Sequence, residues 1–553
     1  MKKHKIVAFI LGIVFLISSF AGCSTPAEST NLSESTTSAK PTNPLENASV
    51  SLDAPVETEY GLVSGDYDAT NELYSFLGIP YAAPPVGDLR WKAPQEPKPW
   101  DDVRECKTFG ANELQDISMN KMMAEAMTAG NDGMFPYITM YTSPEEEYSE
   151  DCLYLNVWTP ATTSDEKLPV VVYIHGGGMT TGSGSIPIYS GKGLAKKGVV
   201  FVSINYRLGV FGFFAHPDLT GEADYNASGN YGILDQVKGL EWVKNNIEAF
   251  GGDPNNVTIA GQSAGSRSVA IHTVSPLSSG LFSRAIAESS HIFTDNKTLV
   301  EAEAEGVEFM QNIGASSLED LRSFSAQDLQ DAAMEMFSGG AIVDGYVMSD
   351  TGYNLYHQNK QTTVPILLGS NKDESGFATV ETKEEFIEDA NSKYGENADK
   401  FLELYPATSD EEAMQSSIER ETDERGWGMY HWADLMSQGS DVYFYYFDWT
   451  PTGAHNGAFH TAEMPYIYNN LDVLEEYSWQ GVETDYKLAD VSSDYMINFI
   501  KTGNPNGDSL PKWSKLNSSK DMVMQLGENI GMVENNKLAK YDFLVSYYSS
   551  LEK

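Results

Sequence analysis

One short stretch constrains the fold of this chain more than any other part of its sequence. Residues 257–265 read VTIAGQSAG, so the β-branched residues of a short strand run directly into Gly-x-Ser-x-Gly, and an apolar, helix-compatible segment follows. Glycines two positions before and after Ser263 let the strand and the helix approach each other through a very sharp turn. In such a turn the serine has a strained backbone and lies exposed at the start of the helix, where free N–H groups favour negative charge. We therefore predict that Ser263 is a nucleophile.

The region around this turn alternates short apolar strands with helical segments. We expect strands over residues 153–158, 170–174, 199–205, 257–260, 285–288, 365–369 and 442–447. Between two of them, apolar residues recur every three or four positions over residues 232–250, which predicts a helix with one buried face that ends at a Gly-Gly pair. This alternation is typical of a mostly parallel sheet with helices on both faces. Since no linker interrupts the pattern, we predict one large α/β domain over residues 57–553.

A run of glycines follows the second predicted strand. Residues 170–179 read VVVYIHGGGM, which is a buried strand that ends in an HGGG-type loop. An acyl-transfer site needs backbone N–H donors close to the reacting oxygen, and residues without side chains permit that approach. We predict that the N–H groups of Gly177, Gly178 and Ala264 form an oxyanion hole, in which losing one donor typically costs ~3–4 kcal/mol. A phosphate-binding P-loop is excluded, because no Gly-Lys-Ser/Thr follows the glycines.

The two partners of the serine are expected further along the chain, in the order acid and then histidine. A catalytic base should lie in a loop after a strand, and His460 follows the last predicted strand. His455 occupies the same loop and is an alternative. The acid is expected in the polar loop after the sixth strand, where Asp373 and Glu374 are adjacent, although Glu463 could also pair with His460. Spacing alone leaves these choices open.

The N-terminal region has the pattern of an export signal. Basic residues 1–5 precede an apolar run over residues 6–20, which is too short for a comfortable membrane span. Small residues then precede Cys23, as in the lipobox of bacterial lipoproteins. We expect lipid attachment at Cys23, with ordinary cleavage and secretion as the alternative. Residues 24–56 are rich in Ser, Thr, Asn and Pro, and they are predicted to be a flexible tether between the anchor and the folded domain.

Charge and cysteine content limit the partners and the covalent links of the chain. The formal net charge of −43 argues against a nucleic-acid partner, because there is no basic stripe to neutralise phosphates. It suits a protein that works outside the cell and contacts the membrane only through its lipid anchor. Apart from Cys23, the chain has two cysteines, Cys106 and Cys152. A disulfide between them is a prediction that the sequence leaves open.

Several segments together resemble the type B carboxylesterases, the cholinesterase-like branch of the α/β-hydrolases that includes bacterial para-nitrobenzyl esterases. These segments are FLGIPYA at 76–82, PPVGDLRW at 84–91, EDCLYLNV at 150–157, NYRLG at 205–209, GNYGILDQ at 229–236 and FGGDP at 250–254. The resemblance extends from residue 57 to residue 541. It implies an α/β-hydrolase fold, a carboxylic-ester hydrolase that acts on small molecules through an acyl-enzyme, and no metal or organic cofactor.

The resemblance also implies roles for individual residues. The nucleophile is Ser263, the acid is Glu374 and the base is His460, which leaves His455 and Glu463 in supporting positions. Two structural ion pairs are implied as well, Arg90 with Glu150 and Arg207 with Asp235.

Three departures from the family pattern affect the expected substrate and the expected disulfide. The residue before the nucleophile, often Glu in the family, is Gln262, and the segment 115–150 has no tryptophan where cholinesterases place their choline-binding ring. Both changes argue against a quaternary-ammonium substrate. The family's first disulfide cysteine normally lies in a Phe-Gly-Pro-x-Cys segment, whereas residues 109–113 read FGANE and Cys106 lies earlier. A bridge from Cys106 to Cys152 would therefore be displaced.

Taken together, the residues predict an exported serine esterase of small or medium uncharged esters, lipid-anchored at the bacterial cell surface. A surface-binding protein without activity is an alternative, because the same fold also serves in adhesion. An amidase or thioesterase with the same three groups is another, because these reactions require the same machinery as ester cleavage.

Overall fold

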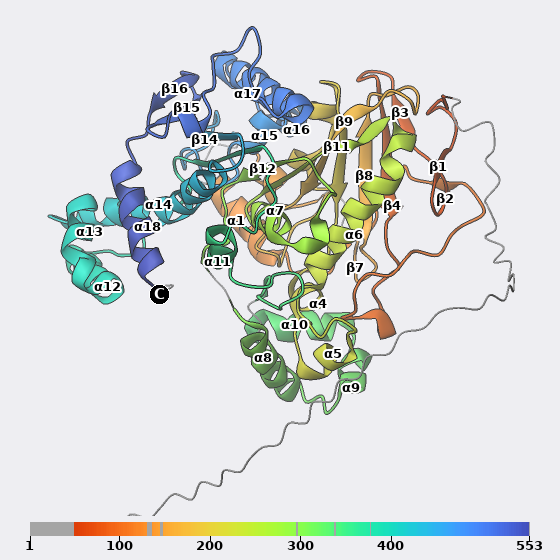
Figure 1. Cartoon of the computed structure of the whole chain (residues 1–553), viewed down its shortest axis with the longest axis horizontal. Helices are drawn as coiled ribbons and strands as arrows, with labels where there is room; N and C mark the ends of the chain where they lie inside the picture. The colour runs from red at the N-terminus through yellow and green to blue at the C-terminus, as the bar shows by residue number, and fades with distance from the viewer. Residues whose placement is uncertain are drawn as a thin grey trace, which may run out of the picture. The chain divides into compact units, whose positions relative to one another are not determined.

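A computed structural model describes residues 49–129, 135–143, 147–294, 297–336, 339–375 and 378–551 (Figure 1). Its main feature is an 11-stranded sheet with the strand order β16-β15-β14-β13-β12-β11-β9-β10-β8-β4-β3. The strands from β10 through β9 and β11 to β15 pair in parallel, and the pairs at both edges are antiparallel. In chain order, the strands of this sheet are β3 Asp66–Asp68, β4 Leu73–Pro80, β8 Tyr154–Thr159, β9 Leu168–Ile174, β10 Val200–Ile204, β11 Gly252–Gln262, β12 Arg284–Glu288, β13 Ile366–Asn371, β14 Val442–Asp448, β15 Met522–Gly527 and β16 Gly531–Glu534.

The sequence predicted the centre of this sheet correctly. Each of the seven expected strands is present, with bounds that differ by a few residues. The expected helix is α6, Tyr231–Asn246, which continues as a 3-10 turn over Ile247–Phe250. It ends where Gly251 adopts a left-handed φ of 80°. The α/β-hydrolase fold is therefore confirmed.

Strand β9 shows why the sequences of the central strands are continuously apolar. Val170, Val172 and Ile174 pack into one hydrophobic cluster, whereas Val171 and Tyr173 pack into a second one. Successive side chains of a strand point to opposite faces, so the two clusters are the two faces of the sheet. Helices α6 and α7 (Ala264–Val274) cover the first face, and α17 (Glu483–Thr502) covers the second.

Both implied ion pairs are present and bidentate. The Arg90 guanidinium lies 2.7 and 2.6 Å from the two carboxylate oxygens of Glu150. The Arg207 guanidinium lies 2.7 Å from each oxygen of Asp235. Since these arginines and Asp235 are buried, the pairs tie loops to the body of the domain away from solvent.

The folded part begins earlier than the sequence indicated. The tether was expected to extend to residue 56, but Leu52 is buried and its N–H donates to the Thr162 carbonyl at 3.0 Å. The Val50 carbonyl accepts the N–H of Ser164, also at 3.0 Å. Residues 49–56 therefore belong to the domain. Residues 1–48, with the predicted export signal and Cys23, lie outside the described residues, and no described helix is both long and apolar enough to cross a bilayer.

The predicted disulfide is wrong, because Cys106 and Cys152 are both free and buried. Cys106 follows β5 (Arg104–Glu105), and burial raises the pKa of its thiol to about 11. Burial also raises the pKa of the Cys152 thiol, and the charges of Glu113 and Asp235 act in the same direction. The two thiols thus have different surroundings.

Candidate active site

The turn at Ser263 has the strained geometry that its glycines predicted. Ser263 lies between β11 and α7 with φ 56° and ψ −123°, in a region that few side chains tolerate. An added Cβ at Gly265 would lie 1.9 Å from the Ile174 carbonyl oxygen, so only glycine fits beside the end of β9. The Ser263 N–H donates to the Glu288 carbonyl at 2.8 Å and holds the turn against the next strand.

Glu374 and His460 meet across 86 residues of chain. The Nδ1 atom of His460 lies 2.6 Å from Oε2 of Glu374, and the Asn371 N–H donates to the other oxygen at 2.8 Å. Burial acts to raise the pKa of Glu374, but the charge and the hydrogen bond of His460 outweigh it and hold that pKa below its ordinary value. The carboxylate is therefore ionised and fixes the ring with Nδ1–H as the donor. This leaves Nε2 as the proton acceptor.

The Nε2 atom of His460 faces the turn at the end of β11. Its partner there is the side-chain nitrogen of Gln262, which lies 3.2 Å away and immediately precedes Ser263. The Gln262 side chain therefore occupies the position next to Nε2 of His460 in this structure. The sequence identified Gln262 only as a missing negative charge and did not predict this contact.

Asp373 supports the loop that carries His460. Asp373 Oδ2 accepts the N–H of Ala458 at 2.8 Å, and its own N–H donates to the Ala458 carbonyl at 3.1 Å. Gly457 has φ 67°, and a Cβ there would lie 2.1 Å from Asp373 Oδ2. One carboxylate thus orients the ring, and its neighbour anchors the backbone of the loop.

The competing candidates do not contact the reacting groups. The N–H of His455 donates to the Tyr137 hydroxyl at 3.3 Å. Glu463 is fully buried and accepts a hydrogen bond from the Asn371 side-chain nitrogen. Burial and the charge of Glu374 raise the pKa of Glu463 to about 8, so it is protonated at neutral pH. Glu463 thus lies beside the catalytic groups through Asn371, whereas His455 contacts Tyr137.

The glycines after β9 form an open loop beside Ser263. Gly177 has φ 104° and Gly178 has φ 67°. A Cβ at Gly177 would lie 2.1 Å from the Thr181 carbonyl oxygen, which requires glycine there. Within the described part of the chain, the N–H groups of Gly177, Gly178 and Ala264 donate to no acceptor. These three donors are therefore unused among the described residues, and Gly178 and Ala264 line the same cavity as Ser263.

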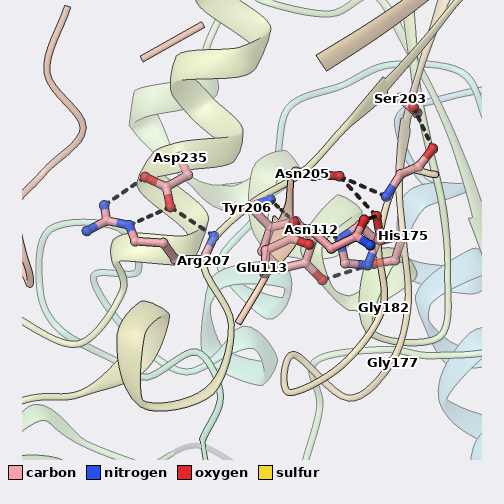
Figure 2. A network of polar contacts seen from close by, with 12 residues as sticks. Asn112, Glu113, His175, Gly177, Gly182, Ser203, Asn205, Tyr206, Arg207 and Asp235 are labelled. Carbon is pink, nitrogen blue, oxygen red and sulfur yellow. Dashed lines mark hydrogen bonds and ion pairs between the residues drawn. The ribbon is translucent and has the colours of Figure 1, made fainter. Parts of the chain in front are cut away.

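A buried polar network lies beneath this loop (Figure 2). His175 Nδ1 donates to the Gly176 carbonyl at 2.8 Å, and its Nε2 atom lies 3.6 Å from Glu113 Oε1. The same Glu113 oxygen accepts the N–H of Tyr206 at 2.8 Å, and the Tyr206 hydroxyl donates to the His175 carbonyl at 2.9 Å. Burial raises the pKa of Glu113. From the sequence, Glu113 was recognised only as an acidic residue at a position where the family has cysteine. Its contacts with His175 and Tyr206 were not predicted.

A cavity of about 420 Å³ opens beside the nucleophile. Its lining includes Ser263 together with Gly178 and Ala264, so a bound group would reach both the nucleophile and two of the unused donors. Elsewhere in the cavity wall, Met179 and Ile342 contribute apolar surface. Among the described residues, no group of three or more His, Cys, Asp or Glu side chains is arranged to hold a metal ion.

Several known esterases are similar to this chain. Residues 53–544 match the model of the carboxylesterase family. Fumonisin B1 esterase of Sphingopyxis macrogoltabida is 33% identical over 501 residues, which cover 86% of this chain and 87% of that protein. Para-nitrobenzyl esterase of Bacillus subtilis is 35% identical over 82% of this chain and 91% of its own. A solved structure of a PNB esterase, 31% identical, superimposes with a TM-score of 0.76 and covers 89% of this chain and 99% of its own.

Proposed function

This chain belongs to the carboxylesterase family and is a carboxylic-ester hydrolase, and we propose that it cleaves small or medium-sized esters through an acyl-enzyme on Ser263. The observation that carries the proposal is the 2.6 Å contact from His460 Nδ1 to the buried Glu374. It leaves Nε2 of the imidazole facing the strained turn that presents Ser263. A serine, a histidine base and a carboxylate that orients the base are the groups that acyl transfer requires.

In the proposed reaction, Ser263 Oγ attacks the ester carbonyl while Nε2 of His460 takes its proton. For this step Nε2 exchanges the amide of Gln262 for the serine hydroxyl. The N–H groups of Gly178 and Ala264, with that of Gly177, stabilise the oxyanion of the tetrahedral intermediate. His460 then protonates the leaving alcohol, and water repeats the sequence on the acyl-enzyme.

Glu374 has an electrostatic role in this scheme. Its ionised carboxylate holds the Nδ1–H tautomer of His460 and stabilises the imidazolium that forms during attack. Replacing it by glutamine keeps the shape of the side chain but removes its charge. We expect Glu374→Gln to lower kcat by about 10³- to 10⁴-fold, with less change in KM.

The direct test is hydrolysis of para-nitrophenyl esters from acetyl to decanoyl by the purified protein, beside Ser263→Ala. We expect the variant to fall to the background rate while its thermal unfolding curve stays that of a folded protein. A variant that kept the wild-type rate would refute the assignment of the nucleophile. A folded wild type that cleaved none of these esters, but cleaved amides or thioesters, would move the proposal to that reaction class.

We also propose that the protein is exported and anchored by a lipid on Cys23. Support comes from the basic residues 1–5, the apolar run over 6–20 and the small residues before the cysteine. Cells grown with an azide-bearing palmitate analogue should label the wild type and not Cys23→Ser. Unlabelled wild type released into the medium would instead mean cleavage by ordinary signal peptidase.

A further inference from the structure

The cavity beside Ser263 has a cationic wall. Arg267, Lys297 and Arg425 line it, and no carboxylate is among the described residues of its lining. The chain as a whole has 36 Lys and Arg residues and 79 Asp and Glu residues. A cavity with three basic residues and no acidic one in its described lining therefore has the opposite charge to the chain as a whole. Composition alone does not account for this wall.

The three cations come from separate parts of the chain. Arg267 lies one turn into α7, where its N–H donates to the Ser263 carbonyl at 3.0 Å. Lys297 precedes α8 (Leu299–Asn312), and Arg425 lies in α14 (Asp410–Met436). The fold therefore brings them to the cavity from three elements.

Arg425 differs from Arg420, the other arginine of α14. Arg420 faces the carboxylates of Asp389 and Glu421, whereas Arg425 is exposed and has no hydrogen-bond or ion-pair partner in the described part of the chain. Lys297 already pairs with Glu305 at 2.6 Å, so part of its charge is compensated. Arg425 is thus the side chain best placed to bind an anion in the cavity.

The position of His460 indicates which half of an ester this cavity holds. The leaving alcohol must lie next to His460, because His460 protonates it. His460 is not among the described residues of the cavity wall, whereas Gly178 and Ala264 are. The alcohol therefore leaves on the other side of Ser263, and the acyl group occupies the cavity.

Resting on the proposed acyl-enzyme mechanism, we propose that the cavity binds an acyl group that carries a free carboxylate. The preferred substrates are then half-esters of dicarboxylic acids, or esters of acids with several carboxyl groups. The sequence-based expectation of uncharged esters followed from Gln262 and a missing tryptophan. Both features argue only against cationic substrates, and they are compatible with anionic ones.

The test compares two esters that differ only in charge. Monoethyl glutarate has a carboxylate at the end of its acyl chain, and ethyl glutaramate has a neutral amide of the same shape. Hydrolysis is followed by proton release in a pH-stat. We expect kcat/KM for the half-ester to exceed that for the amide by about tenfold, which is the scale of one hydrogen bond to a charged group. A third ester, the butyrate of 3-hydroxypropanoate, places the carboxylate on the alcohol and should gain no such advantage.

Variants then locate the effect in the cavity. Arg425→Gln should lower the ratio of the two kcat/KM values by about fivefold, near the upper limit for an exposed ion pair. Arg104→Gln removes the same charge from an exposed arginine on β5, outside the cavity, and should leave the ratio unchanged. Equal kcat/KM values for the half-ester and the amide would overturn the proposal, as would an equal loss in both variants.

Binding to Ser263→Ala separates this proposal from the proposed function. Calorimetry should show tighter binding of monoethyl glutarate than of ethyl glutaramate, whether or not the wild type cleaves them. If the wild type cleaves the amide ester without preferring the anion, only the acyl-pocket proposal fails. If it cleaves neither these two esters nor the para-nitrophenyl esters, the proposed function fails, and the calorimetric comparison still decides whether the cavity selects anions.

Discussion

The buried carboxyl of Glu463 provides a quantitative test of the electrostatics around the site. Burial and the charge of Glu374 raise its pKa from the ordinary 4.5 to about 8. Between these values the folded protein keeps the proton and the unfolded chain loses it, so the free energy of unfolding falls as pH rises. The slope is about 1.4 kcal/mol per pH unit, which amounts to about 3 kcal/mol between pH 4.5 and pH 7.

Glu463→Gln removes this dependence. Glutamine is neutral in both states, and its carbonyl oxygen can accept the hydrogen bond that Asn371 donates to Glu463. Relative to the wild type, the variant should gain about 1 kcal/mol in free energy of unfolding at pH 5, about 2 at pH 6 and about 3 at pH 7, with any constant packing difference added. Equilibrium urea unfolding at each pH measures the difference.

The matched control is Glu388→Gln, which removes a carboxylate from the exposed side of α12 (Lys383–Tyr394). Its difference from the wild type should stay constant from pH 5 to pH 7. The reasoning is refuted if the Glu463→Gln difference is equally flat, because the carboxyl would then titrate alike in the folded and unfolded chain.

Three further perturbations test the rest of the site and its frame. Gln262→Glu places a carboxylate next to Nε2 of His460, and this charge favours the protonated ring. The acid limb of the pH profile of kcat/KM should therefore move up by about one pH unit. If the limb does not move, the contact between residue 262 and His460 does not form in solution. Gly265→Ala should abolish soluble expression, because its Cβ would lie 1.9 Å from the Ile174 carbonyl, whereas Gly221→Ala, with open space around it, should express normally. Since neither cysteine of the described domain forms a disulfide, dithiothreitol should leave Tm unchanged, and a fall in Tm would contradict the free thiols.

The parts of the site that the sequence predicted depend on local signals. The turn at Ser263 follows from five consecutive residues, because a strand and a helix can approach so closely only when glycine removes the side chains in between. The glycine loop after β9 is determined in the same way. The central strands were also predictable, since a sheet covered on both faces requires apolar residues throughout.

The parts that the sequence missed depend on contacts between distant segments. Asp373 binds the backbone of Ala458, which is 85 residues away, and nothing in the local pattern of either segment indicates this pairing. Gln262 meets His460 because the parallel strands β11 and β14 have their carboxyl ends on the same side of the sheet. Gln262 ends β11, and the loop after β14 carries His460. The resemblance to known esterases identified His460 and Glu374, but it gave no information on residues where this chain departs from the family.

Position 113 shows how such a departure changes the support of a site. The family pattern places a disulfide cysteine there, and this chain has Glu113, whose charge still acts on the Cys152 thiol. A disulfide would restrict the unfolded chain as well as the folded one. The hydrogen bond that the Tyr206 N–H donates to Glu113 and the close contact of Glu113 with His175 exist only in the folded state. The base of the oxyanion loop is therefore held by polar contacts whose strength depends on protonation and burial, and it needs no oxidising environment to form.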